Sequence, residues 1–217
     1  MIVPQITARQ AVERVTAGAR LMVGGYLNNG RPDTLLKMQR LHGEGGLHLI
    51  SNDAGFPGSQ LYKLMVSGKV ASLVASHIGM TPEVGNMIVA GRLEADLIPQ
   101  GTLIERVRSG GAGLGGFLTP TGLGTPAQEG KRVIEVEGQA YLLELPLQAD
   151  VAFIRASRAD AYGNLWYHGS TRNMNVCMAT AAACVVAEVD EIGEIDPDNV
   201  VVPGLFVDAL VLRGNEG

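Results

Sequence analysis

Short apolar runs alternate with helix-like stretches through the first hundred residues, and this alternation limits the possible folds more than any other feature. The apolar runs are typical of buried parallel strands and lie at 21–23, 48–51, 70–75 and 94–98. Parallel strands joined by helices make right-handed crossovers, so their strand-to-helix loops meet at one edge of the sheet. The sequence therefore predicts an α/β fold with an open, mainly parallel sheet flanked by helices.

The stretches between these strands carry helix start and stop signals. Thr7 and Gln10 have the spacing of a capping box, so the first helix is expected from Ala8 to Ala17, before Gly18. The following helices are expected at 32–41, 61–67 and 81–91. Each would return the chain to the start of the next parallel strand.

Glycines and polar residues follow the ends of all four strands. Ligands of open parallel sheets bind at the carboxyl edge of the strands. We therefore expect one candidate binding rim, made of residues that lie far apart in the chain: Gly24, Gly25, Asn52, Asp53, His77, Gly79, Gln100 and Gly101.

The stretch from Leu97 to Thr125 is rich in glycine and carries almost no charge after Arg108. A short amphipathic helix is expected at 102–108, and glycines follow at positions 110, 111, 113, 115, 116, 122 and 124. Their GxGxxG pattern follows a helix and does not open one, so the context of a dinucleotide site is missing. We expect backbone that closes against the rim or against a partner.

A second glycine pattern has the spacing of a phosphate loop. It runs from Gly25 to Gly30, but Arg31 and Pro32 stand where Lys and Ser or Thr are required. The pattern is therefore not a Walker A loop.

The second half of the chain has a different character. Segments 132–136 and 139–144 are typical of a β-hairpin around Glu137 and Gly138. No repeat or long linker interrupts the 217 residues, so a single domain over 1–217 is expected. Further elements are an alanine-rich helix at 174–183 and strands at 149–156, 165–168, 184–189 and 206–212.

Composition argues against several classes of protein. The net charge is -5 and the 17 Lys and Arg residues are scattered, so no nucleic-acid partner is expected. The first residues lack the pattern of a secretory signal, which favours the cytoplasm. The uncharged stretch 174–187 is shorter than the roughly 20 residues that span a bilayer, so no membrane partner is expected. Cys177 and Cys184 fit reduced, buried thiols, and no metal site is expected.

Two rim residues have side chains suited to chemistry. His77 could act as a general base, but no Ser or Cys nucleophile lies in a recognisable elbow, and a lone His is often structural. Gln100 follows Pro99 at a strand end, where its amide could donate a hydrogen bond to an oxyanion or simply hold the turn. The residues alone leave these alternatives open, and no carboxylate is marked as a nucleophile.

Several long blocks resemble the α subunits of family I CoA-transferases, over essentially the whole chain. GGYLNNGRP is similar to a signature of two glycines, an aromatic residue, three further residues and Gly-x-Pro, and SNDAG is similar to a Ser-Asn-Asn-Ala-Gly loop. PQGTLIERVRSGGAG is nearly the family text. SHIGMTPEVGNMIVAG and GGFLTPTGLGT most resemble the branch that uses acetate, butyrate and acetoacetate, rather than the succinyl branch.

The resemblance implies the fold of ribose-phosphate and glucosamine-phosphate isomerases and a ping-pong exchange of CoA between carboxylic acids. A Glu attacks the acyl-CoA, giving an acyl-glutamyl anhydride and then a glutamyl-CoA thioester. That Glu lies in a β subunit, in a Ser-Glu-Asn-Gly motif that this chain lacks. The chain is thus expected to be half of an α2β2 assembly, with coenzyme A as part of the substrate and no further cofactor.

The resemblance also assigns roles by position. Gln100 would hydrogen-bond the carbonyl oxygen of the anhydride and tetrahedral states, with Asn52 and Asp53 beside it. The substrate-binding set that it implies is Gly24, Gly25, Tyr26, Gly30, Asn52, Asp53, His77 and Gly101.

Some positions depart from the family pattern. Tyr26 replaces the usual Phe, and Asp53 replaces the second Asn of its loop, which would place a charge near a carboxylate-binding site. Asn173-Met174-Asn175-Val176 replaces the usual Asn-Phe-Asn-Pro. These changes are expected to alter the acyl pocket and the preference for the acid.

Three alternatives remain. The chain could be the α subunit of a 3-oxoacid (succinyl) CoA-transferase. It could instead be a non-catalytic module of the same fold that senses a sugar phosphate or an acyl-CoA. A sugar-phosphate isomerase would need a positioned base and phosphate-binding cations at the rim, where Arg31 is the candidate.

Overall fold

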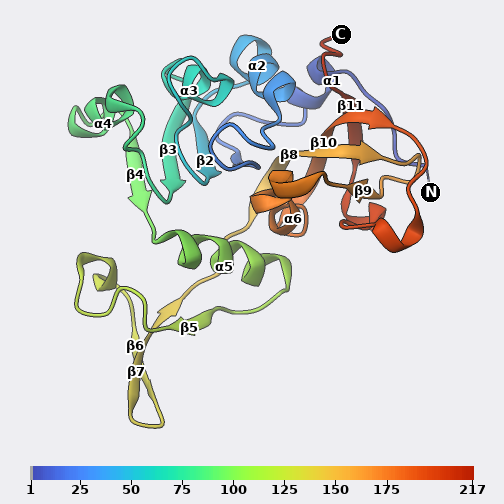
Figure 1. Cartoon of the computed structure of the whole chain (residues 1–217). Coiled ribbons are helices and arrows are strands. Elements are labelled where there is room, and N and C mark those ends of the chain that lie inside the picture. Colours follow the sequence, from blue (N-terminus) through green and yellow to red (C-terminus); the bar gives the residue numbers. More distant parts are fainter. Residues whose placement is uncertain (1) are drawn as a thin grey trace.

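A mainly parallel sheet forms the centre of the computed structural model, which describes residues 2–217 (Figure 1). Its strand order is β11-β10-β8-β1-β2-β3-β4, and the short β9 pairs antiparallel with β8. The expected α/β fold is confirmed. The strands are β1 (Arg20–Val23), β2 (Leu47–Ser51), β3 (Val70–Ala75), β4 (Glu94–Leu97), β8 (Ala149–Ala159), β9 (Leu165–Trp166), β10 (Ala182–Ile192) and β11 (Ala209–Leu212).

Helices cover both faces of this sheet and bury two separate apolar clusters. One face is covered by α1 (Ala8–Val12), α2 (Asp33–His42), α3 (Gln60–Met65) and α4 (Pro82–Val89), and the other by α5 (Gln100–Gly111) and α6 (Asn173–Met178). Successive residues of β1 show the two sides. Leu21 and Val23 belong to the first cluster and Met22 to the second, as expected for a strand buried on both faces.

Three helices differ in length from the sequence-based expectation. The Thr7 capping box is present, but α1 ends at Val12, because the chain then turns to bury Val15. The last helix ends at Met178 instead of residue 183, where the Thr180 hydroxyl bonds the carbonyl of Cys177 and β10 soon begins. In contrast, α5 extends beyond the expected residues 102–108 at both ends.

The extension of α5 changes the interpretation of the glycine run. Gly110 and Gly111 are helical, and a Cβ on either would overlap the Leu147 carbonyl or the Thr180 side chain, so they allow close packing of α5. The later glycines follow the end of α5 at Gly111. That they close against the rim or against a partner stays a prediction.

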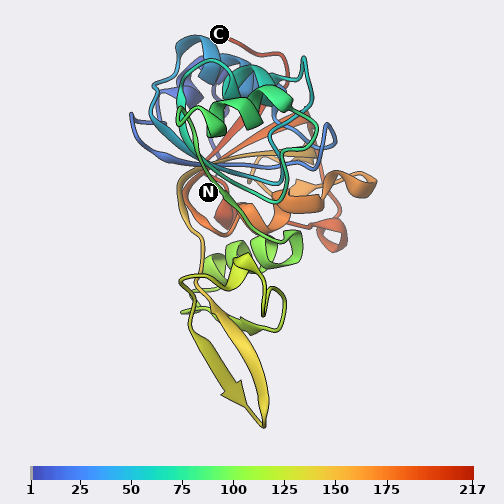
Figure 2. The same cartoon turned by 90° about the vertical axis from the view of Figure 1, so that its left-hand side faces the viewer.

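A second, antiparallel sheet projects from the body below α5 (Figure 2). It has the order β5-β7-β6, with β5 (Phe117–Thr119), β6 (Val133–Val136) and β7 (Gln139–Glu144). The expected hairpin is confirmed, and its turn uses positive φ angles of 52° at Glu137 and 76° at Gly138. Whether this sheet and the body form a single domain over residues 1–217 remains a prediction.

The pairing register gives the two faces of the small sheet different characters. Opposite and alternate residues share a face. Leu142 and Glu144 are buried toward the body, where Glu144 accepts a bond from Lys131 at 2.6 Å. The opposite face carries five apolar side chains and, at its end, Gln139. We call it the apolar face, and its apolar residues are Leu118, Ile134, Val136, Tyr141 and Leu143. Leu118 and Val136 are 39% and 43% exposed.

Candidate active-site rim

The loops that follow β1, β2, β3 and β4 lie side by side at the carboxyl edge of the sheet. The Ser76 N–H donates to the Asn52 carbonyl at 2.9 Å, and Asp53 forms a parallel bridge with His77. The chain after β4 bonds back to Ala75, the last residue of β3. The expectation that these distant residues share one edge is confirmed, whereas their contacts with a substrate remain proposals.

The rim adjoins the point where the strand order reverses, between β1 and β8. Such a reversal is where open α/β sheets bind ligands. The loop of residues 24–30, which we call the glycine loop, leaves β1 at this point.

A buried ion pair joins the glycine loop to the Asn52 loop. The Arg31 Nη2 lies 2.6 Å from the Asp53 Oδ2, and both side chains are almost fully buried. Burial lowers the pKa of Arg31, and the Asp53 charge opposes this shift. The Asp53 carboxylate also accepts bonds from the N–H groups of Leu27 and Gly55 at 3.0 and 2.8 Å. The Asp53 charge expected near a carboxylate-binding site is thus neutralised within the chain.

The signature glycines are required by packing within the chain. A Cβ on Gly24 would overlap the Asn175 Oδ1. Gly25 has a φ of 103°, and a Cβ there would lie 2.7 Å from the Arg31 side chain. Gly30 has a φ of 67°, and a Cβ would lie 2.8 Å from the Thr171 carbonyl. Side chains or backbone from other segments occupy the space that these glycines leave.

Asn175 at the start of α6 holds this region together, although its sequence motif was noted only for its departures. Its Nδ2 donates to the carbonyls of Gly30 and Thr171 at 3.0 and 2.9 Å, and its Oδ1 accepts from the Arg155 N–H at 3.0 Å. The side chain is fully buried. The Asn-x-Asn spacing that the chain shares with the family pattern was the available signal.

The glycine loop presents Tyr26 at its tip. Tyr26 and Asn29 exchange two backbone hydrogen bonds of 3.0 and 2.9 Å, which close a tight turn. Leu27 inside this turn has a φ of 52°, which is rare for a residue other than glycine. Tyr26 is 45% exposed.

His77 is held by its neighbours. Its Nδ1 lies 3.0 Å from the Ser76 Oγ, and that hydroxyl donates to the Asn52 carbonyl at 2.7 Å. Because the hydroxyl proton is used, Nδ1 is the donor in the first bond, and Nε2 is the acceptor nitrogen of the neutral ring. This arrangement suits a structural residue, and its suitability for base catalysis stays a prediction.

Gln100 is the first residue of α5 and is exposed. Among residues 2–217, no side-chain hydrogen bond involves its amide, and no side chain caps the N-terminus of α5. The first N–H groups of a helix lack intrahelical partners and carry the positive end of the dipole. The amide of Gln100 and these N–H groups form a set of donors suited to an oxyanion. A Cβ on neighbouring Gly101 would meet no atom within 4 Å.

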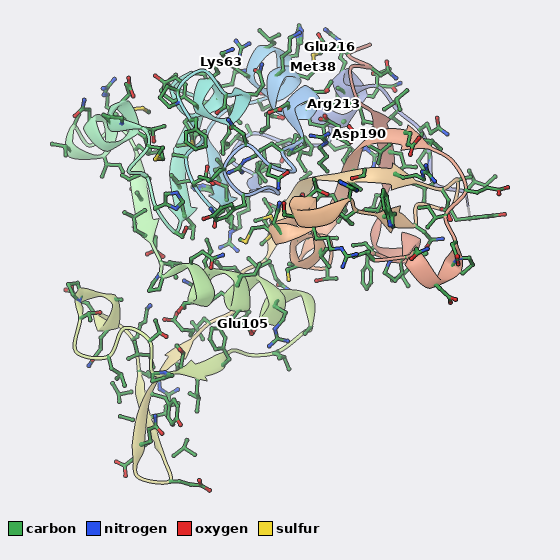
Figure 3. The ribbon with its side chains drawn as sticks, in the orientation of Figure 1. Met38, Lys63, Glu105, Asp190, Arg213 and Glu216 are labelled. Carbon is green, nitrogen blue, oxygen red and sulfur yellow. The ribbon has the colours of Figure 1, made fainter. Side chains whose placement is uncertain are left out.

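By contrast, the N-terminus of α2 is already occupied. The Glu188 Oε2 accepts bonds from the N–H groups of Thr34 and Leu35 at 2.8 and 3.2 Å. Burial raises the pKa of Glu188 to about 7. The Nε of Arg213 lies 3.8 Å from the Glu188 Oε1. Figure 3 shows Arg213 beside Asp190. A helix end that could bind phosphate is therefore filled by a carboxylate of the chain itself. Glu188 is not among the residues predicted from the sequence, although a charge within the apolar run of β10 is a visible signal.

Three large hollows of the surface lie away from the rim. The largest of the three, of about 630 Å³, is lined by Asp160 and Ile195 among others. One of about 590 Å³ is lined by Arg9, His42 and Glu44 among others, at the amino edge of the sheet. Another of about 550 Å³ involves Tyr162 and Leu205. None of the three includes a predicted site residue.

Within residues 2–217, no group of three or more His, Cys, Asp or Glu side chains is arranged to hold a metal ion. Cys177 and Cys184 are free, but they are partly exposed instead of buried as expected. No helix in the described part of the chain has the length and apolar character needed to cross a membrane.

Comparisons with known proteins agree with the fold. The family described as Coenzyme A transferase matches residues 5–213. The alpha subunit of the acetate CoA-transferase of Escherichia coli K12 is 44% identical over 210 residues, covering 95% of this chain and 96% of its own. The acetoacetyl-CoA:acetate/butyrate CoA transferase alpha subunit of Clostridium acetobutylicum is 42% identical, covering 89% and 90%.

Two further comparisons add a relative with a different named substrate and a solved structure. A succinyl-CoA:3-ketoacid coenzyme A transferase subunit of Xanthomonas campestris (strain B100) is also 44% identical, covering 95% of this chain and 87% of its own. The crystal structure of an acyl-CoA transferase apoenzyme from Escherichia coli O157:H7 has a TM-score of 0.86 at 22% identity, covering all of this chain and 48% of that one.

The chain belongs to the Coenzyme A transferase family. Within this family it corresponds to the α subunits and is part of a transferase.

Proposed function

We propose that the chain is the α half of a CoA-transferase that moves CoA between short-chain acids of the acetate, butyrate and acetoacetate type. The main support is the exposed, unbonded amide of Gln100 at the uncapped N-terminus of α5. The named activities of two similar α subunits support the choice of acids. Cytoplasmic location, and coenzyme A as substrate with no additional cofactor, belong to the same proposal.

In the proposed reaction, a Glu from the β subunit of the complex attacks the acyl-CoA carbonyl, and the CoA thiolate leaves from the tetrahedral state. The thiolate then attacks the glutamyl carbonyl of the resulting anhydride and releases the first acid. The carboxylate of a second acid then attacks the glutamyl-CoA thioester and expels the CoA thiolate, which gives a new acyl-glutamyl anhydride. The thiolate attacks the acyl carbonyl of this anhydride, which forms the new acyl-CoA and releases the Glu carboxylate. Negative charge develops on a carbonyl oxygen in each step, and Gln100 donates to that oxygen.

The need for a partner nucleophile is supported by the chemistry of the rim. Asp53 is the carboxylate among the predicted site residues of the rim. It forms an ion pair with Arg31 and accepts hydrogen bonds from backbone N–H groups. A carboxylate held in this way is a poor nucleophile, because attack would leave the Arg31 charge buried without a counter-ion.

We propose that the apolar face of the small sheet contributes to the contact with the β subunit. Three short antiparallel strands bury little surface by themselves. A face of five apolar side chains would gain stability by being covered. The proposed assembly is α2β2.

Activity measurements with and without the partner test this function. The isolated chain should transfer no CoA, whereas the co-purified complex should transfer CoA between acetyl-CoA and butyrate or acetoacetate. Full activity of the isolated chain, or an inactive complex with all of these acids, would contradict the proposal.

The alternative of a succinyl-CoA:3-ketoacid CoA-transferase has specific support. The succinyl-CoA:3-ketoacid relative is as similar as the acetate relative, so succinyl-CoA should be included among the donors. A preference for succinyl-CoA over acetyl-CoA would assign the chain to that branch. A phosphate-sensing module is less consistent with the rim, because Glu188 occupies the N-terminus of α2.

A further inference from the structure

We propose that the buried Arg31–Asp53 ion pair is a positioning element that fixes the glycine loop and its tip residue Tyr26, and thereby sets which acyl chain the rim accepts. This inference rests on the proposed CoA transfer. It concerns discrimination between acids, whereas the proposed function concerns the transfer itself.

Arg31 acts as the core of the glycine loop. Its Nε donates to the Leu27 carbonyl at 2.7 Å and its Nη1 to the Gly24 carbonyl at 3.1 Å, while Nη2 faces Asp53. The guanidinium thus contacts the loop before its turn, at Gly24, and within the turn, at Leu27. Gly25 curves around the Arg31 side chain, which occupies the space that a Cβ there would need. The loop backbone is therefore shaped by this one side chain.

Asp53 connects the same loop to the next strand. Its Oδ2 accepts from the Leu27 N–H and from the Asn52 Nδ2, both at 3.0 Å, in addition to Arg31. Both backbone polar groups of Leu27 are thus bonded to the ion pair. Asn52 itself is fully buried beside the His77 segment. A change in the pair is expected to move the glycine loop relative to the rest of the rim.

The loop stores backbone strain that the pair maintains. Leu27 has a φ of 52° and Gly25 a φ of 103°. A non-glycine residue at positive φ persists where its surroundings hold it there. Without the pair, Leu27 is expected to relax to negative φ, which turns the half-exposed Tyr26 at the tip away from its present position.

The pair is suited to discrimination because it holds the backbone of the turn that carries Tyr26. Tyr26 has few rotatable bonds and projects from a turn closed by two backbone hydrogen bonds to Asn29. A fixed aromatic wall distinguishes acids that differ by one or two methylene groups, and a mobile one does not. One methylene is typically worth about 10-fold or more in discrimination.

The test uses the assembled complex with Arg31→Met, Asp53→Asn and the double variant. Each single change leaves a buried charge without its counter-ion and should lower the melting temperature, whereas the double change removes both charges and should restore most of it. Lys37→Met is the matched control, because it breaks the partly exposed pair with Glu216 at a distance from the rim. It should leave both stability and discrimination close to those of the parent.

The decisive readout is the ratio of kcat/KM for butyrate and acetate as acceptors. The double variant should change this ratio by about 10-fold or more, which is the discrimination that one methylene can provide. A restored melting temperature with the parent's ratio would show that the pair is only structural and would overturn the inference.

Tyr26→Ala supplies an independent arm. It should change the acid ratio in the parent complex but add little in the double variant, because both changes remove the same wall. An unchanged ratio in Tyr26→Ala would also overturn the inference, even if no Arg31 or Asp53 variant folded. A parent complex that transfers CoA to none of the acids would instead overturn the proposed function, and this inference with it.

Discussion

The rim and the small antiparallel sheet differ in how their side chains are covered. In the rim, buried polar groups from distant segments satisfy one another, as the Arg31–Asp53 pair and the bonds of Asn175 show. In the small sheet, one side faces the body, while the apolar face is only partly covered, with Leu118 and Val136 exposed. The chain therefore forms its own rim but leaves part of an apolar surface uncovered, which suits the proposed contact with a second subunit.

The largest expected effect is a loss of stability caused by a substitution at Gly24, beneath the rim. Gly24→Ala would place a methyl group against the Asn175 Oδ1 and disturb the bonds of a fully buried amide. Overpacking combined with a broken buried network should destabilise the chain by about 4 kcal/mol or more. Urea unfolding measures this loss.

Gly85→Ala is the matched control for this change. Gly85 lies in α4, and a Cβ there would meet no atom within 4 Å. The substitution should raise stability by about 0.5–1 kcal/mol, since alanine favours the helix. A similar stability for both variants would contradict the tight fit of the rim.

The next effect is on turnover. Gln100→Ala should leave assembly and stability unchanged but lower kcat about 100-fold or more, because an oxyanion donor is lost. Gln5→Ala, which removes an exposed Gln from the N-terminal segment, is the control and should remain active. Near-normal turnover of the Gln100 variant would mean that its amide has no part in the chemistry.

The buried carboxyl group behind the rim should make stability depend on pH. The pKa of Glu188 is raised to about 7 from an ordinary value of 4.5. Its contribution to stability is therefore fully present below about pH 4.5 and is lost as the pH rises through about 7. Stability should fall by about 2–3 kcal/mol across this range from this group alone.

Glu188→Gln should flatten this dependence when unfolding is followed between pH 5 and pH 8. Glu191→Gln serves as the control, because Glu191 lies on the same strand but is exposed in a surface pair with Arg158. If the Glu188 variant retained the parent's full pH dependence, the cause would lie elsewhere in the chain.

The smallest effect concerns the apolar face. Leu118→Asp should lower the stability of the isolated chain only modestly, because the side chain is 39% exposed, but should weaken β-subunit binding about 10-fold. Glu135→Ala, on the opposite face of the same sheet, is the control. Titration of labelled β subunit measures both. Equal affinities would exclude the apolar face from the contact, and loss of self-association alone would assign it to a second copy of this chain.

The sequence predicted the features that depend on local patterns. Apolar runs indicated the strands, and the positions after them indicated the rim, including Gln100. Contacts between residues that lie far apart in the chain could not be predicted from the sequence. The Asn175–Gly30 bond spans 145 residues and the Glu188–Thr34 bond spans 154, so no local signal predicts either partner. Arg31 was considered only as a phosphate ligand, because its burial against Asp53 becomes visible only once β1 and β2 are adjacent.

In the proposed reaction, this chain supplies the oxyanion donor and a partner supplies the nucleophile. The most direct test is to trap the CoA intermediate of the assembled complex with borohydride or hydroxylamine and to locate the modified residue in both polypeptides by mass spectrometry. We predict that a Glu of the β subunit is modified and that this chain is unmodified. A modified residue in this chain would contradict the account.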